Sequence, residues 1–469
     1  MVEKINPYIQ QYNYNTINSV RNVTKVQNTE TYGNGAFAHS AFASSLPFRA
    51  SANNSINLRT SLSGKEEKQK YSNIMSKLDK NSKKVVDTLL KNGVLLNNNS
   101  SDGTSVLDNL NKIIDEPRAQ GLNNVGILKD TIATIAYPYL ITQQFGNIPY
   151  NYHNIVLQAY NQSANPTSKT PNDVNVEHSG TCVAASTEFK LAKQMPAEFA
   201  RFAAELSSPK MSVERNIKLE NLADNTLNGV WLLNAFNVPF TMDNYNNAKI
   251  KLAPDKNAII RAQIQTVDKD PYERTPLDVL MQSTFMQVGS QQAYNSLTDK
   301  RGGKFNQNDK GLIEFEKTFT ESVVFDKNIL SVTYQTVDEN ARLIGYETDL
   351  ATMKKHLIQS LNMGENIIIG YTQTDSNNII INGHEITIVG YKEGKDGRIT
   401  FICNDTDDGI SRPIEYSEEF LLPKIHHAAL PKEVVETDMQ FTPNWVEGIA
   451  MYKKMKRESQ LQLQKQIAA

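Results

Sequence analysis

The stretch from residue 348 to residue 404 constrains the fold most, because a helical pattern there is followed by apolar segments. Apolar residues recur at helical spacing from 350 to 361, Thr348 or Asp349 can cap the helix, and Gly364 follows as a stop. Three strands are expected next, at 367–371, 378–391 and 399–403. The segment 392–398 is the expected turn between the last two. A helix followed by antiparallel strands predicts an α+β fold.

A histidine and an asparagine stand at corresponding ends of the last two strands. His384 opens the apolar part of one strand, and Asn404 closes the next. In an antiparallel hairpin the first residue of one strand lies opposite the last residue of the other, so a turn near Gly394 predicts that His384 faces Asn404. An amide beside an imidazole can accept its N–H and fix its tautomer. Asp405 is an alternative partner for the same ring, and an ordinary strand-edge histidine is the plain alternative.

A cysteine stands where a loop of small residues meets a predicted helix. Residues 179–181 precede Cys182, and residues 182–193 have a helical pattern. The free N–H groups and partial positive charge of a first helical turn stabilise a thiolate, which is the nucleophilic form of cysteine. Cys182 is therefore the candidate nucleophile, and a buried structural cysteine is the alternative.

Three short blocks of this chain resemble the papain-like cysteine peptidases. Residues 180–186 look like the family's Gly-Ser-Cys-Trp-Ala-Phe-Ser core, and residues 384–391 match the fixed positions of its His-x4-Val-Gly-Tyr strand. Residues 402–406 look like its Ile-Lys-Asn-Ser-Trp turn. The helix, apolar strand and histidine strand at 350–391 also resemble bacterial relatives that cleave double-glycine leader peptides. The blocks are spread over residues 175–422.

The resemblance implies a fold, a reaction and a set of site residues. The fold would have two lobes, one helical and one an antiparallel half-barrel, with a cleft between them. Cys182 would be the nucleophile, His384 the base and Asn404 the residue that orients the base. The reaction would be hydrolysis of a peptide or amide bond in a peptide or protein substrate, without a metal or organic cofactor.

The chain departs from the family's pattern at several positions. The oxyanion-hole glutamine is replaced by Val176, which leaves Asn175, or less well His178, as the candidate side-chain donor. Val183 stands where the family has tryptophan, and the tryptophan after the asparagine is missing. The long separation between the cysteine and the histidine implies an insertion within 210–345.

The 469 residues suggest two or three domains. We expect a flexible tail at 1–64, a helical region at 65–145, a hydrolase domain at 146–435 that starts with a loop-like segment to 178, and a helical tail at 436–469. The region 65–145 is either an intramolecular pro-segment, as in many papain-like enzymes, or an accessory unit.

Composition excludes several classes of protein. A formal net charge of -2 gives no general attraction to nucleic acid, and no segment has the roughly 18 apolar residues of a membrane span. Two cysteines exclude a disulfide framework and four-thiolate zinc sites. The N-terminus has no apolar core of a secretory signal, so a cytoplasmic or unconventionally exported protein is expected. His426 and His427 could suggest a metal site, but adjacent side chains diverge and no carboxylate or cysteine has a supporting spacing, so they are interpreted as a solvated surface pair.

Two other functions stay open. A non-catalytic binding protein on a degenerate papain-like scaffold would explain the lost tryptophans and Val176. A Cys-His-Asp acyltransferase of the transglutaminase-like type would use Asp405 in place of Asn404.

Overall fold

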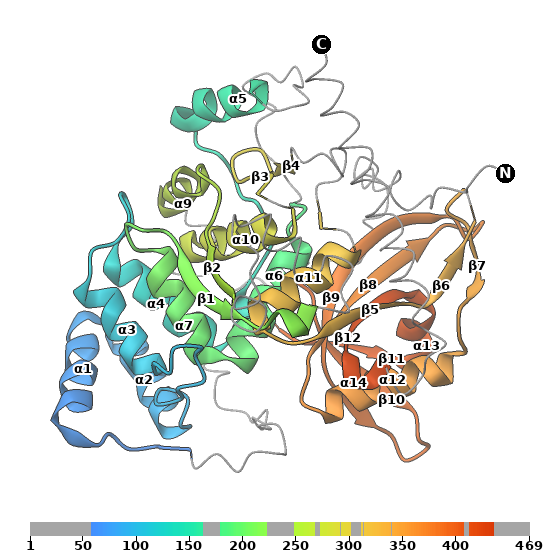
Figure 1. Cartoon of the computed structure of the whole chain (residues 1–469), viewed down its shortest axis with the longest axis horizontal. Helices are drawn as coiled ribbons and strands as arrows, with labels where there is room; N and C mark the ends of the chain where they lie inside the picture. The colour runs from blue at the N-terminus through green and yellow to red at the C-terminus, as the bar shows by residue number, and fades with distance from the viewer. Residues whose placement is uncertain are drawn as a thin grey trace, which may run out of the picture.

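A computed structural model places most of the chain between residues 58 and 435 (Figure 1). It describes residues 58–162, 179–222, 248–267, 273–290, 292–301, 311–312, 314–338, 340–407 and 412–435. The expected tail at 436–469 and nearly all of the expected tail at 1–64 therefore lie outside the described residues. Within them, most helices lie apart from the main antiparallel sheet, which agrees with the predicted α+β class.

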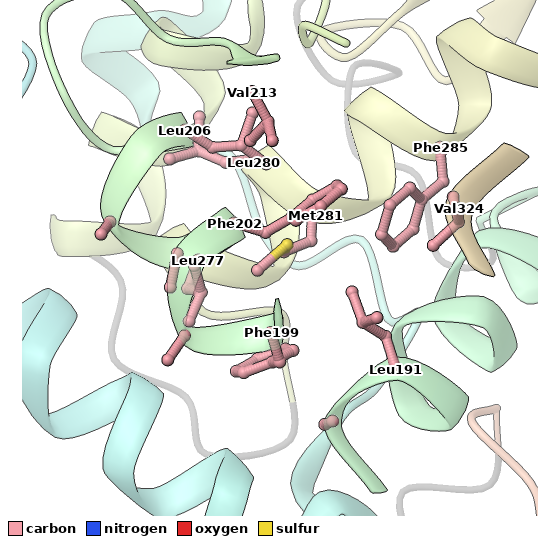
Figure 2. Packing of buried hydrophobic residues seen from close by; sticks show 14 of the residues in the cluster. Leu191, Phe199, Phe202, Leu206, Val213, Leu277, Leu280, Met281, Phe285 and Val324 are labelled. Atoms are coloured by element: carbon pink, nitrogen blue, oxygen red, sulfur yellow. The ribbon is translucent and has the colours of Figure 1, made fainter. Parts of the chain in front are cut away.

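Helices form one side of the molecule, here called the helical half. Its main helices are α1 (Gly64–Lys77), α2 (Lys80–Lys91), α3 (Val106–Asp115), α4 (Asn124–Ala136), α6 (Cys182–Gln194), α7 (Pro196–Leu206), α9 (Ala258–Val267), α10 (Pro276–Gly289) and α11 (Glu314–Phe325). All of these helices contribute side chains to one hydrophobic cluster. The small sheet of β1 (Val213–Ile217) and β2 (Ala248–Leu252) contributes to the same cluster. Figure 2 shows its centre, where Phe199 and Phe202 of α7 lie near Met281 and Phe285 of α10.

An antiparallel sheet forms the other side, here called the sheet half. Its strand order is β11-β10-β9-β8-β12-β5. The bounds are β5 (Ile329–Thr333), β8 (Ile367–Thr374), β9 (Ile380–Glu393), β10 (Ile399–Asn404), β11 (Ile414–Ser417) and β12 (Ile425–Pro431). Helices α12 (Leu350–Asn362), α13 (Glu418–Leu421) and α14 (Lys432–Val435) pack with it around a second hydrophobic cluster.

Smaller elements complete the described chain. Helix α5 (His153–Asn161) packs in a third cluster with residues near 145 and with Ile264 of α9. Two short hairpins are β3 (Tyr294–Asn295) with β4 (Lys300–Arg301), and β6 (Gln335–Val337) with β7 (Leu343–Tyr346).

Strand β9 is the boundary between the two halves. Side chains alternate across a strand, so its two faces have different neighbours. Ile386 and Ile388 belong to the cluster of the sheet half, whereas Val389 packs against the cluster of the helical half. Helix α6 packs directly on β9. The helix that begins at Cys182 and the strand that carries His384 are therefore adjacent.

Local sequence signals explain most element boundaries. The Asp349 carboxylate accepts a hydrogen bond from the Thr352 N–H and caps α12, as expected from sequence. Pro196 occupies the first turn of α7, and Ser105 and Asp108 form a capping box on α3. The helix, strand and turn segments expected between 350 and 404 are confirmed. The loop-like interpretation of 146–178 is wrong where α5 forms.

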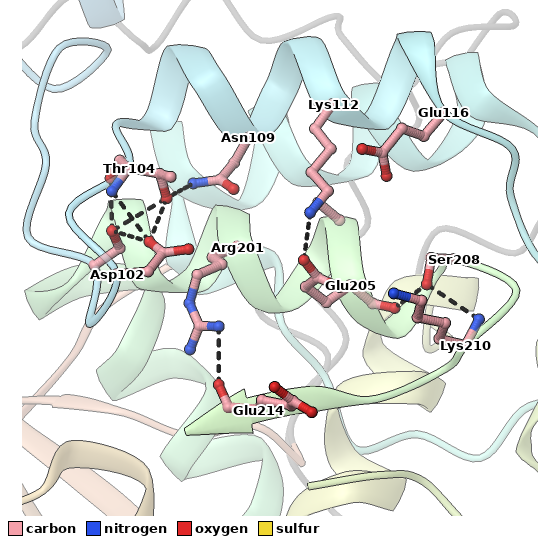
Figure 3. Close-up of polar contacts among 12 residues, drawn as sticks. Asp102, Thr104, Asn109, Lys112, Glu116, Arg201, Glu205, Ser208, Lys210 and Glu214 are labelled. Carbon is pink, nitrogen blue, oxygen red and sulfur yellow. Dashed lines mark hydrogen bonds and ion pairs between the residues drawn. The ribbon is translucent and has the colours of Figure 1, made fainter. Parts of the chain in front are cut away.

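The region 65–145 has no core of its own. Helices α1 to α4 contribute to the same hydrophobic cluster as α6 and α7. Polar contacts add to this packing: Lys112 of α3 pairs with Glu205 of α7, and Arg201 of α7 donates to the Glu214 carbonyl of β1 at 3.2 Å (Figure 3). The segment 210–345, expected as an insertion, likewise supplies α10 and α11 to this half and β5 to the main sheet.

The described part of the chain contains no helix with the length and apolar character that crossing a membrane requires.

Candidate functional site

Cys182 is the first residue of α6 and is 5% exposed. The turn before it is held by hydrogen bonds: the Gly180 N–H donates to the Asp299 carboxylate at 2.6 Å, and the Thr181 N–H donates to the Ser179 hydroxyl at 3.0 Å. The Thr181 side chain does not cap α6. The sequence therefore predicted the start of this helix correctly, but gave no sign of Asp299, which lies more than a hundred residues away.

His384 bonds to a carboxylate at the end of the next strand. Its Nε2 atom lies 2.6 Å from Oδ1 of Asp405, and both side chains are 15% exposed. The same carboxylate oxygen accepts the Asp407 N–H at 2.9 Å, which fixes its direction. The Cys182 side chain lies close enough to the ring to interact with it, and Nδ1 is the ring nitrogen left to face it. Three side chains from three segments thus converge.

Asn404 does not face His384, contrary to the expectation from strand register. It lies opposite Thr387, three residues farther along β9. The turn is centred later than expected, since the Gly394 N–H bonds to the Arg398 carbonyl, and a β-bulge between Ile402 and Cys403 moves the register back by only one residue. The Asn404 side chain is buried, and its Nδ2 has no hydrogen-bond partner among the described residues. Asp405, the alternative from sequence, is the residue that pairs with the ring.

The charges of the three side chains reinforce one another. Burial opposes protonation of the His384 ring, but the Asp405 charge and the contact with Cys182 outweigh it and raise the pKa of His384 well above its ordinary value. Burial alone would raise the pKa of the Asp405 carboxyl, but the His384 ring lowers it below its usual value. Each partner therefore favours the charged form of the other, an imidazolium beside a carboxylate.

Cys403 has the opposite environment. It is fully buried in β10, and burial followed by the nearby Asp405 charge raises the pKa of its thiol strongly. A thiol that stays protonated is a poor nucleophile. Of the two cysteines, only Cys182 has a base beside it.

An aromatic residue that the sequence did not point to lies beside the ring. Tyr371 of β8 is directly opposite His384 of β9, so both side chains are on one face of the sheet. Burial, with the Asp405 charge adding to it, raises the pKa of Tyr371. Tyr371 stacks on Tyr416 at 6.4 Å between ring centroids, and Tyr416 stacks on Phe420 at 5.2 Å. A row of three aromatic rings therefore begins next to His384.

Other candidates from sequence have different outcomes. Asn175, Val176 and His178 lie outside the described residues. His426 and His427 are buried rather than solvated, because both are on β12; His427 pairs with Glu385 at 3.1 Å. Across the described ranges, no group of three or more His, Cys, Asp or Glu side chains is arranged to hold a metal ion.

Comparisons of the chain with known protein families, with curated proteins and with solved structures found no match.

Proposed function

We propose that this protein is a thiol-dependent hydrolase with Cys182 as nucleophile, His384 as base and acid, and Asp405 as the residue that orients the histidine. The observation that carries the proposal is the His384 ring, which contacts the Cys182 side chain and bonds to Asp405 at 2.6 Å. A nucleophile beside a base that is itself oriented by a third group is the general arrangement of covalent acyl-transfer catalysis.

The reaction proceeds in two balanced steps. The Cys182 sulfur forms a bond to the substrate carbonyl carbon, and the C–N bond then breaks while His384 gives its proton to the leaving amine. In the second step His384 takes a proton from water, the water oxygen attacks the thioester, and the thiol is released with the acid product. Asp405 keeps the ring oriented and stabilises its positive charge in both steps.

The first turn of α6 provides the environment for the charge that develops. The backbone N–H of Cys182 and the positive end of the helix are suited to stabilise an oxyanion on the substrate carbonyl. A second hydrogen-bond donor from the segment before residue 179 would complete this oxyanion hole, and Asn175 is the candidate.

The substrate class and the fold family are part of the proposal. A helical half and a sheet half, with the cysteine at a helix start in one and the histidine on a strand in the other, suit a papain-like two-lobed arrangement. Peptide or protein substrates are the family's usual substrates. The residues proposed here act without any group beyond those the chain supplies.

A second candidate differs only in the acyl acceptor. An aspartate as the orienting residue favours comparison with transglutaminase-like acyltransferases, in which an amine takes the place of water. Adding a primary amine to the reaction separates the two, because a transferase incorporates the amine into the product.

The test of the proposal is the reactivity of the two cysteines toward iodoacetamide across pH. In a Cys403→Ala variant we expect Cys182 to be alkylated below pH 7 at least about tenfold faster than a free thiol. In the matched Cys182→Ala variant, Cys403 should remain almost unlabelled, because it is buried and protonated. If Cys182 reacts no faster than a free thiol, the enzyme proposal fails and a binding protein on a related scaffold becomes the better explanation.

A further inference from the structure

Gln282, in the middle of α10, is completely buried and bonds to three other segments. Its Nε2 donates to the Thr142 carbonyl at 2.9 Å and to the Glu188 carboxylate at 3.1 Å. Its Oε1 accepts from the Thr181 hydroxyl at 2.9 Å. Burying an amide is costly unless it is hydrogen-bonded, so these contacts fix the side chain in one orientation.

The first of these segments is the turn before the nucleophile. Thr181 immediately precedes Cys182, and its carbonyl accepts the Ala185 N–H at 2.8 Å, which is the first backbone bond of α6. Because the Thr181 hydroxyl is held by Gln282 and by Ser179, it does not turn to cap the helix. Gln282 therefore holds the backbone from which the Cys182 side chain projects.

The second segment leads to the residue that orients the base. The Thr142 hydroxyl and the Gln143 N–H both donate to the Thr406 carbonyl, at 3.1 and 3.0 Å. Thr406 follows Asp405 directly and donates its own hydroxyl to the Gln143 side chain at 3.1 Å. The strand-like segment 142–144 thus ties the Asp405 turn of the sheet half to Gln282 of the helical half.

A continuous path of hydrogen bonds consequently joins both sides of the site. It runs from the start of α6 through Thr181, Gln282 and Thr142 to Thr406, next to Asp405. We propose that Gln282 is a positioning residue that sets the distance between Cys182 and the His384–Asp405 pair. This inference rests on the proposed function. Gln282 does not itself reach the reacting atoms; an amide suits its place because it donates to Thr142 and accepts from Thr181 at the same time.

The test uses two variants of the path and one matched control, all in the Cys403→Ala background. Gln282→Met keeps the side-chain volume but removes all three bonds. Thr142→Val is a smaller change that removes the hydroxyl bond to Thr406. The control is Thr284→Val, which removes a buried hydroxyl bond of the same helix, to the Leu280 carbonyl at 2.8 Å, away from the path.

Two measurements report on the site without a known substrate. The first is the rate of alkylation of Cys182 by iodoacetamide at pH 6.5. The second is the titration of the His384 ring, followed by NMR of ¹⁵N-labelled histidines. We expect Gln282→Met to slow alkylation at least about tenfold and to lower the titration midpoint of His384 by about one pH unit. Thr142→Val should have the same effects in smaller size, and Thr284→Val should change neither.

Thermal unfolding separates positioning from stability. Gln282→Met and Thr284→Val should both lower the melting temperature, but only the former should change the site. The proposal is wrong if a folded Gln282→Met or Thr142→Val protein keeps the alkylation rate and the His384 titration of its parent, or if Thr284→Val changes them equally. A parent protein whose Cys182 reacts like a free thiol refutes the enzyme proposal instead, while the His384 titration still decides the role of Gln282.

Discussion

The helix that carries Cys182 and the helix that covers the sheet are buried in different ways. In α6 every side chain from Cys182 to Ala192 is buried, including Glu188 and Lys190. In α12 only one stripe is buried, and Lys354 on its outer side pairs with Glu418 at 2.6 Å while still 25% exposed. The sheet half also buries polar side chains beside its hydrophobic cluster, among them Glu385, His426 and His427. Helix α6 therefore depends on matched polar partners for its buried charges, whereas α12 depends on the packing of one buried stripe.

This difference extends to the site. Cys182 stands on a helix whose surroundings include buried charges and amides, and His384 stands on β9 of the main sheet. A hydrogen bond inside a low-dielectric region is stronger than one in water, but leaving one partner unpaired there costs more. Changes to polar residues should therefore have larger effects around α6 than around α12.

The largest effect is expected on turnover, at the rim of the sheet. Asp405→Asn should reduce the rate of the proposed reaction by about 10²–10⁴-fold, because the amide can hold the wrong ring tautomer and does not stabilise the imidazolium. It should also lower the pKa of His384, since the Asp405 charge is what raises it against burial. The protonated form of His384 would then be lost at lower pH than in the wild type, as a pH titration of the ring by NMR will show.

Asn404→Ala is the control for that prediction. The Asn404 amide nitrogen has no hydrogen-bond partner among the described residues, so this variant should lose much less activity than Asp405→Asn. Equal losses would mean that Asn404, as the papain resemblance implies, orients the base in solution.

The next largest effect is expected on stability, in the helical half. Lys190 pairs with Glu321 at 3.0 Å, and both side chains are at most 1% exposed. Lys190→Met should lower the free energy of unfolding by about 3 kcal/mol, because a buried carboxylate loses its closest cation. Lys354→Met on α12 removes a partly exposed pair and should cost less than about 1 kcal/mol. Urea denaturation measures both, and similar losses would remove the contrast between the two helices.

The smallest effect concerns two buried acids, Glu188 of α6 and Asp278 of α10. Glu188 and Asp278 are buried beside each other, an arrangement that favours one proton held between the two carboxyls; burial raises the pKa of Asp278 to about 6 and that of Glu188 well above its usual value. A carboxyl with a raised pKa in the folded state holds a proton that the unfolded chain releases. The stability that this proton contributes is therefore lost as the pH rises from the pKa of the carboxyl in the unfolded chain through its pKa in the folded protein.

Glu188→Gln should remove that dependence. We expect the variant to gain about 1–2 kcal/mol relative to wild type at pH 8 and less at pH 5, since its amide can bond to Asp278 without a proton. Glu66→Gln, at a side chain that is 80% exposed, is the matched control and should leave the free energy of unfolding unchanged at both pH values. Unfolding at the two pH values measures the gain, and a wild-type stability that does not fall between them would contradict the shared proton.

The sequence by itself determined the elements of the site. The pattern at 182–193 predicted the helix at Cys182, and the apolar strands and glycine turn predicted the hairpin that carries His384, because helices and strands follow from local periodicity and caps. It also offered Asp405, but only as the alternative to Asn404. The choice between those neighbours depended on a turn centred later in the chain and on one β-bulge, which local patterns do not specify.

Only the tertiary structure decided what holds these elements together. Gln282, Asp299 and Thr142 lie 40 to 120 residues from the turn at Cys182 and belong to no motif, yet their hydrogen bonds fix it directly or through one another. The physical reason is that buried polar groups must find partners wherever the fold brings them, and such pairings leave no period in the sequence.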